Sequence, residues 1–301
     1  VTVTGAILWR GGRLCGPGTI AGLVTIESGK ILYGQDSVHF AGGIYVQAAG
    51  SGTLQSDSGV FYLDAPVQRV SNIASIKQVI HFGCENALDP AQSLSIGAGY
   101  GKYGAWNLHG FNQRCGTISC ASTGDNEGAT YFTSDGPATL TINNQTSDTT
   151  LYGNFKGQLS FDYASSSGKK FTLAGGANDM TGKITVRSGT VAITAKTVFS
   201  ALSGLDLLGT GKFEIPAGMI FEIDSACVDG TALAPTTAFA GPFVAAAGKG
   251  VVATFDYFTD APPAKPSVDM IDSRCAIRLF GSSRTFTRPV KYSGTVRRTC
   301  I

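Results

Sequence analysis

The residues of this sequence best suited to chemistry are its three histidines, its seven cysteines and a number of scattered carboxylates. His39, His81 and His109 each stand alone within apolar, strand-like sequence, which favours a structural role for each of them over catalysis. No Ser, His and Asp arrangement can be identified, and no glycine-rich phosphate loop of the Gly-Lys-Thr type is present. The sequence therefore predicts no catalytic residue and no cofactor.

Seven cysteines are an odd number, so at least one is unpaired or bonded to another molecule. The candidates for disulfide or intermolecular bonds are Cys115, Cys120, Cys275 and Cys300. Five positions separate Cys115 from Cys120, which places them on opposite faces of a straight strand unless Gly116 turns the chain. A second interpretation makes the cysteines small apolar residues of a core. A zinc site would need a tighter set of Cys and His, so no metal is expected.

Three aromatic residues lie among glycines: Tyr100, Tyr103 and Trp106. Rings exposed in a row could stack on the faces of sugars, which makes these residues carbohydrate-binding candidates. The alternative is that they point inward and cover a core.

A short pattern recurs along the chain and predicts the elements that position these residues. In residues 182–189 two glycines seven apart enclose alternating apolar residues, and similar segments occupy residues 22–29, 43–50 and 211–218. Alternation predicts strands with one buried face, and the closing glycine predicts a turn. One such unit cannot bury its apolar face alone, whereas stacked units can share a continuous core. The pattern predicts an all-β parallel β-helix, or β-solenoid.

The segment from Ala105 to Ala195 resembles the autotransporter-associated β-strand repeat of secreted and surface proteins from Gram-negative bacteria. The resemblance rests on NLHGFNQ (residues 107–113), FTLAGGANDMTG (residues 171–182) and the strand GTVAI (residues 189–193), with VDGTALAP (residues 228–235) near the usual end of such segments. It implies a right-handed parallel β-helix. It implies no chemistry, because that family is a scaffold.

The composition agrees with an extracellular β-protein. The 301 residues include 40 Gly, and 15% are charged, against about a quarter in ordinary globular domains. No run of 18 apolar residues is present, so no transmembrane segment is expected. The chain begins with Val1, which suggests a processed product or an excised fragment. We expect it outside the cell or on a bacterial cell surface.

We expect three parts: a solenoid over residues 1–254, a linker or edge segment over 255–272 that includes the proline-rich APPAKP, and a basic strand module over 273–301. The basic module contains no carboxylate, while the other 272 residues hold 16 basic and 21 acidic side chains. Its alternating apolar residues predict a hairpin-like module around residues 292–295 that docks on an acidic surface of its own or a neighbouring molecule. The basic residues of this docking segment are Arg274, Arg278, Arg284, Arg288, Lys291, Arg297 and Arg298.

These features favour a structural, adhesin-like protein that self-associates or forms the shaft of a surface assembly. Its expected partners are further copies or other surface proteins, with polysaccharide as a further possibility and no nucleic acid. The alternative is a β-helix that binds or cleaves polysaccharide. Cleavage would need paired carboxylates, for which Asp162 with Asp179, or Glu214 with Glu222 and Asp224, are candidates. The Gly-His-Gly signature of polygalacturonase-like enzymes is missing, because Leu108 precedes His109.

Overall fold

The fold is known from a computed structural model. It describes residues 1–48, 52–56, 58–75, 79–96, 105–120, 130–143, 147–216, 220–223 and 226–233, together with the later strands given below. All the regular elements in these residues are β-strands. No helix that could span a membrane occurs in the part of the chain that the structure describes.

Two long sheets, A and C, run along the molecule, and a shorter sheet, B, lies within its N-terminal coils. Sheet A is made, in spatial order, of β1 (Thr2–Val3), β4 (Gly18–Ile20), β7 (Val38–Phe40), β10 (Phe61–Leu63), β13 (Val79–Phe82), β15 (Ala105–Asn107), β18 (Tyr131–Ile142), β20 (Asn154–Tyr163), β23 (Lys183–Val186), β26 (Gly204–Leu207), β29 (Ala226–Val228) and β30 (Thr231–Ala232), with β16 (Gln113–Cys115) also paired to β18. Sheet B is made of β11 (Val67–Gln68), β8 (Ile44–Val46), β5 (Val24–Ile26) and β2 (Ile7–Trp9). Sheet C is made of β3 (Arg13–Leu14), β6 (Ile31–Gly34), β9 (Gly52–Ser56), β12 (Val70–Ser75), β14 (Ser93–Ile96), β17 (Thr117–Cys120), β19 (Thr149–Leu151), β21 (Lys170–Leu173), β24 (Thr190–Ile193), β27 (Lys212–Ile215) and β32 (Phe243–Ala245).

The remaining strands form small sheets. These are β22 (Ala177–Asn178) with β25 (Val198–Phe199), β33 (Val251–Thr254) between β28 (Ile220–Ile223) and β31 (Thr236–Ala238), and β34 (Ile277–Arg278) with β35 (Val296–Arg297).

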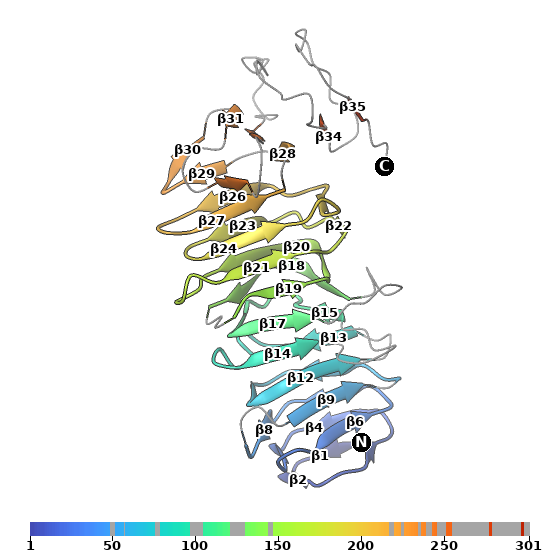
Figure 1. The fold of residues 1–301 in the computed structure, drawn as a ribbon. Helices are drawn as coiled ribbons and strands as arrows, with labels where there is room; N and C mark the ends of the chain where they lie inside the picture. The colour runs from blue at the N-terminus through green and yellow to red at the C-terminus, as the bar shows by residue number, and fades with distance from the viewer. Residues whose placement is uncertain are drawn as a thin grey trace.

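Apart from the antiparallel pair of β29 and β30, the strands of sheets A and C pair in parallel with strands of the neighbouring coils. Phe161 pairs with Ile184, for example, and Ile184 pairs with Leu205. The coils therefore stack along one axis, from the blue N-terminal coils to the orange coils near β29 (Figure 1). The predicted parallel β-solenoid is confirmed and has about nine turns.

The core follows from the alternation of apolar residues, because every second side chain of a strand points inward. A row of inward aromatic rings runs through the middle coils, in which Trp106 lies 5.3 Å from both Phe82 and Phe132 and Phe155 continues the row at 5.4 Å from Phe132. All four rings are fully buried. The row links successive coils through side-chain packing in addition to the backbone ladder.

The glycine pattern predicts the strands and the turns at Gly29 and Gly189 correctly, but not the equivalence of the four segments; Gly50 and Gly218 lie outside the described residues. Residues 182–194 form β23, a turn with Gly189 at φ 77°, and β24. Gly29, at φ 72°, turns the chain in the same way after β5. However, β23 belongs to sheet A, β5 and β8 to sheet B, and β27 to sheet C. The four segments are thus strand-and-corner units used on different sides of the solenoid.

Residues 67–82 and the basic module contain further strands. Residues 67–82 contain β11, β12 and β13, which lie in sheets B, C and A in turn. In the basic module, β34 and β35 pair in parallel, and the hairpin predicted around residues 292–295 lies outside the described residues. The proline-rich segment lies outside the described residues.

Candidate functional sites: a histidine row and an open solenoid end

All three histidines of the chain meet on the outer face of sheet A. His39, Tyr62 and His81 occupy paired positions on β7, β10 and β13. The rings of His39 and Tyr62 are parallel within 1° with centroids 4.0 Å apart, and the Tyr62 and His81 centroids are 4.8 Å apart. From the sequence, each histidine was expected to be an isolated structural residue, so this row was not predicted. We call these three residues, together with His109, the histidine row.

His109 joins the row from the turn that follows β15. Its backbone has φ 48° and that of Gly110 has φ 85°, so the chain makes a left-handed turn directly after Asn107. The buried amide of Asn107 accepts a 3.0 Å hydrogen bond from the His109 backbone N–H, and the Gly110 N–H donates to Ser134 Oγ. These contacts turn the His109 ring toward His81.

The contact between His81 and His109 is edge to edge. Their Nδ1 and Nε2 atoms, respectively, are hydrogen-bonded, the ring centroids are 4.7 Å apart, and the ring planes differ by 17°. If the two rings were stacked face to face with their centroids 4.7 Å apart, His81 Nδ1 and His109 Nε2 would be too far apart for this hydrogen bond. The rings therefore lie side by side in nearly one plane. That is the arrangement a hydrogen bond between ring nitrogens requires, because imidazole donors and lone pairs lie in the ring plane.

Each end of the row is bound by an aspartate. His39 Nδ1 lies 2.7 Å from Asp64 Oδ2, and His109 Nδ1 lies 2.7 Å from Asp135 Oδ2. Asn107 Nδ2 donates a second hydrogen bond, 3.0 Å long, to Asp135. An ionised carboxylate can only accept, so both histidines donate through Nδ1. Burial, followed by the charge of His109, lowers the pKa of His81, while Asp135 acts in the opposite direction.

The described residues show no group of three or more His, Cys, Asp or Glu side chains placed to hold a metal ion. Two of the carboxylates considered as catalytic, Asp162 and Glu214, are bound in ion pairs. Arg187 makes a two-pronged contact with Asp162, its Nη2 lying 2.8 Å from Oδ2, and Lys170 Nζ lies 2.9 Å from Glu214. Asp179 is exposed on a loop, and the Glu222 side chain lies outside the described part of the structure.

The carbohydrate-binding prediction is wrong for Trp106, whose indole is fully buried between Phe82 and Phe132. A buried ring cannot stack on a sugar. Tyr100 and Tyr103 lie outside the described residues, so the prediction stays untested for them.

The cysteine candidates divide in the same way. Cys115 and Cys120 are buried free thiols on sheets A and C, so they are neither bonded to each other nor accessible to another molecule. They fit the alternative in which cysteines fill the core. Cys275 and Cys300 lie outside the described residues, as do the side chains of the basic docking segment from Arg274 to Arg298.

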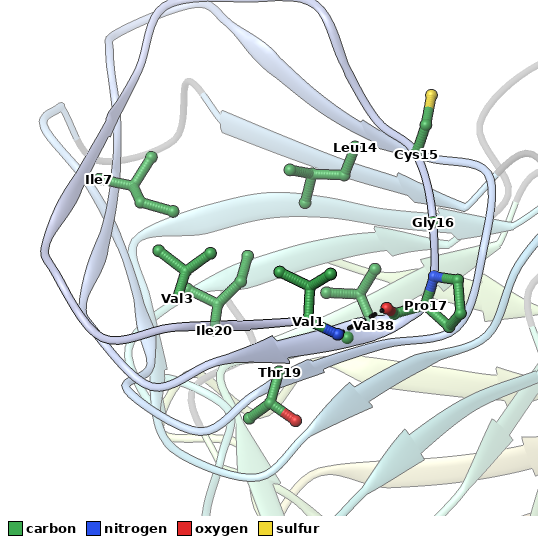
Figure 2. Close-up of a pocket in the computed structure, with 11 residues that line it drawn as sticks. Val1, Val3, Ile7, Leu14, Cys15, Gly16, Pro17, Thr19, Ile20 and Val38 are labelled. Carbon is green, nitrogen blue, oxygen red and sulfur yellow. Dashed lines mark hydrogen bonds between the residues drawn. The ribbon is translucent and has the colours of Figure 1, made fainter.

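A second site lies at the N-terminal end of the solenoid. Sheets A, B and C all end there in strands of the first coil, β1, β2 and β3. A cavity of about 190 Å³ opens at this end, lined by apolar side chains such as Val3, Ile7, Leu14, Ile20 and Val38. Figure 2 shows Ile7, Leu14 and Val3 around this space, with Cys15 pointing away from it. We call this surface the N-terminal face.

Exposed apolar side chains gather at the same end. Among the described residues, the large apolar side chains with high exposure are Val1, Val3, Leu8 and Leu23, with Leu8 48% and Leu23 44% exposed. Among the described strands, β1 pairs with β4 alone: the carbonyls of Val1 and Val3 accept from β4, so the N–H and C=O of Thr2 face away from β4. Apolar side chains beside a free strand edge are the usual signature of a surface that another protein segment covers.

The fold defines the class of the protein as an all-β parallel solenoid of about nine turns. Comparison with protein-family models, with curated proteins and with solved structures finds no match for this chain. The likeness to the autotransporter-type repeat therefore remains a resemblance. The structure shows the β-solenoid that this resemblance implies.

Proposed function

We propose that this protein is an extracellular or cell-surface structural solenoid that self-associates, and that two copies meet through their N-terminal faces. The single observation that carries the proposal is the concentration of exposed apolar side chains and free strand edges at that face. The low charge of the chain and its resemblance to surface-protein repeats support the location.

The two ends of the solenoid differ, which favours contact between like ends. At the C-terminal end β30 pairs antiparallel with β29, and β31 pairs antiparallel with β33, so returning strands cover the edges of β29 and β33. At the N-terminal face, β1, β2 and β3 are each the end strand of their sheet within the part of the chain that the structure describes. A two-fold contact between two such faces would pair β1 with its copy in antiparallel orientation and close after two subunits.

The test is the native mass of the full chain, measured by light scattering and native mass spectrometry. We expect a dimer that persists in high salt and in reductant, because burial of apolar surface is insensitive to both. The double variant Val3→Lys, Leu8→Lys should be monomeric, since it places two charges in the contact. Ser166→Lys, on an exposed turn after β20, is the matched control and should remain dimeric.

Three outcomes would contradict the proposal. A monomer under all conditions would remove self-association. An oligomer that dissociates in high salt would indicate the basic segment, residues 273–301, as the contact. An oligomer that dissociates only in reductant would indicate intermolecular disulfides.

A further inference from the structure

The partners of the histidine row follow one geometric rule. In each case a polar side chain contacts the residue two positions beyond its paired neighbour on the next coil. His39 pairs with Tyr62 and contacts Asp64; His81 pairs with Asn107 and contacts His109. Asn107 pairs with Thr133 and contacts Asp135 in the same way. The row is thus a built arrangement that spans five successive strands of sheet A, from β7 to β18.

The hydrogen bonds assign the protons of the inner pair. Since His109 Nδ1 donates to the ionised Asp135, the Nε2 atom of a neutral His109 ring carries a lone pair. His81 Nδ1 must then donate to it, which leaves His81 Nε2 as the free basic nitrogen. The hydrogen bond between the two rings therefore contains a single proton, which His81 Nδ1 donates to His109 Nε2.

A first added proton leaves this contact intact. It binds at His81 Nε2, and the resulting imidazolium still donates through Nδ1 to His109. A second added proton must bind His109 Nε2. The N–H groups at His81 Nδ1 and His109 Nε2 would then point at each other, and both rings would carry a positive charge. The hydrogen bond between the rings cannot survive that state.

We propose that the His81–His109 pair is an acid-operated clasp on sheet A, closed while the pair carries no more than one added proton and opened by the second. Opening frees His109 and the left-handed turn at Gly110 from β13, so the outer face between β13 and β18 loosens locally. The aromatic core beneath it stays in place, because the clasp lies entirely on the outer face.

The surrounding charges act on the pair from several strands. Asp135 stabilises the protonated His109 ring, whereas His39 opposes protonation of His81. Six further ionisable side chains lie near the pair. They belong to β7, to β10 and the segment after it, and to the outer positions of β18 and β20: His39, Tyr62, Asp64, Tyr131, Asp135 and Lys156. Lys156 Nζ lies 4.9 Å from the centroid of the Tyr131 ring, and Lys156 pairs with Thr133, the neighbour of Asn107.

The direct test is an NMR titration of the three imidazoles in the full chain between pH 4 and pH 9, with ¹³C-labelled histidine. We expect His81 and His109 to titrate in two shared steps separated by more than about one pH unit, as coupled sites do. In His81→Gln the remaining His109 should titrate in a single step. His39→Gln is the matched control, because it removes a ring of the row outside the pair, and the two shared steps should persist.

Hydrogen exchange of the unmodified chain tests the opening itself. The backbone N–H groups of His109 and Gly110, which donate to Asn107 and Ser134, should exchange faster below the second step, after correction for the intrinsic pH dependence. Each further pH unit should raise the open fraction about ten-fold until opening is complete. Independent single-step titrations of His81 and His109, unchanged when the other ring is removed, would overturn the proposal. So would exchange at these two amides that does not respond to acid.

Discussion

The ring of Phe61 fills the space that a side chain would need at Gly34. A Cβ atom built on Gly34 would overlap the Cε1 and Cζ atoms of that ring. Phe61 is fully buried and packs edge-on against Phe40, with ring centroids 5.2 Å apart, so it has no room to withdraw. Gly34 is therefore required by packing.

Replacing Gly34 by alanine should destabilise the protein by roughly 1–3 kcal/mol, the usual cost of overpacking a core. The measurement is the urea midpoint at neutral pH. Gly5→Ala is the control, because a Cβ atom at Gly5 would meet no atom within 4 Å, and its effect should stay within about 0.5 kcal/mol. Equal effects of the two substitutions would contradict this account.

Trp106 contributes its ring to the core but not its N–H group, which is buried without a hydrogen-bond partner. Trp106→Ala should cost about 3–5 kcal/mol because it leaves a large cavity among Phe82 and Phe132. Trp106→Phe should cost less than about 1.5 kcal/mol, since it keeps most of the ring and removes an unpaired polar group. Chemical denaturation of both variants tests the difference. If the phenylalanine variant were as unstable as the alanine variant, the indole N–H would have an essential partner.

The cysteines should differ strongly in reactivity in the folded protein. Burial raises the pKa of the Cys115 thiol far above its usual range and also raises that of Cys120, whereas the Cys15 side chain is exposed. Because the thiolate is the reactive form, iodoacetamide should label Cys15 in the native state and label Cys115 and Cys120 only after unfolding. Mass spectrometry of the labelled peptides gives the order. Rapid native labelling of Cys115 would show that this part of the core is open.

Acid should destabilise the protein through His81. Its pKa is lower in the folded state than the unfolded value of about 6.5, so the unfolded chain binds more protons as the pH falls below that value. The contribution of His81 to stability is complete above the unfolded pKa, decreases as the pH falls toward the folded pKa, and changes no further below it. His81→Gln should reduce this slope when urea midpoints are compared between pH 7.5 and pH 5.

The control for that comparison is Ser166→Gln, which alters an exposed side chain on the turn after β20, away from the histidine row, and introduces no titrating group. Its midpoints should follow the unmodified protein at every pH. A His81→Gln variant with an unchanged pH slope would show that His81 does not couple protonation to folding.

The strands were predictable from sequence because alternation reports directly which side chains face inward. Val24 and Ile26 in β5, and Val191 and Ile193 in β24, follow it, and Gly29 and Gly189 make the predicted turns. Alternation does not report which of three sheets a strand joins. That assignment depends on how many residues each corner uses, and the coils differ in length.

The histidine row could not be predicted from the sequence for the same reason. Phe61 pairs with Ile80 on the next coil, and Ile80 pairs with Trp106, so successive coils advance the chain by unequal numbers of residues. His39, His81 and His109 consequently have no common spacing in the sequence. Their convergence depends on the registers of four strand pairs, from β7 to β18, and on the left-handed turn at His109.

The parallel stacking of coils also determines how the molecule should respond to force. The backbone hydrogen bonds between coils point along the solenoid axis, so a pull on the two ends of the chain loads the bonds of one coil at a time. The protein should then lengthen in steps by peeling coils from its ends. A coil of about 20 residues would release roughly 70 Å of extended chain. Such a shaft is stiff under compression and sideways load, and yields gradually under tension.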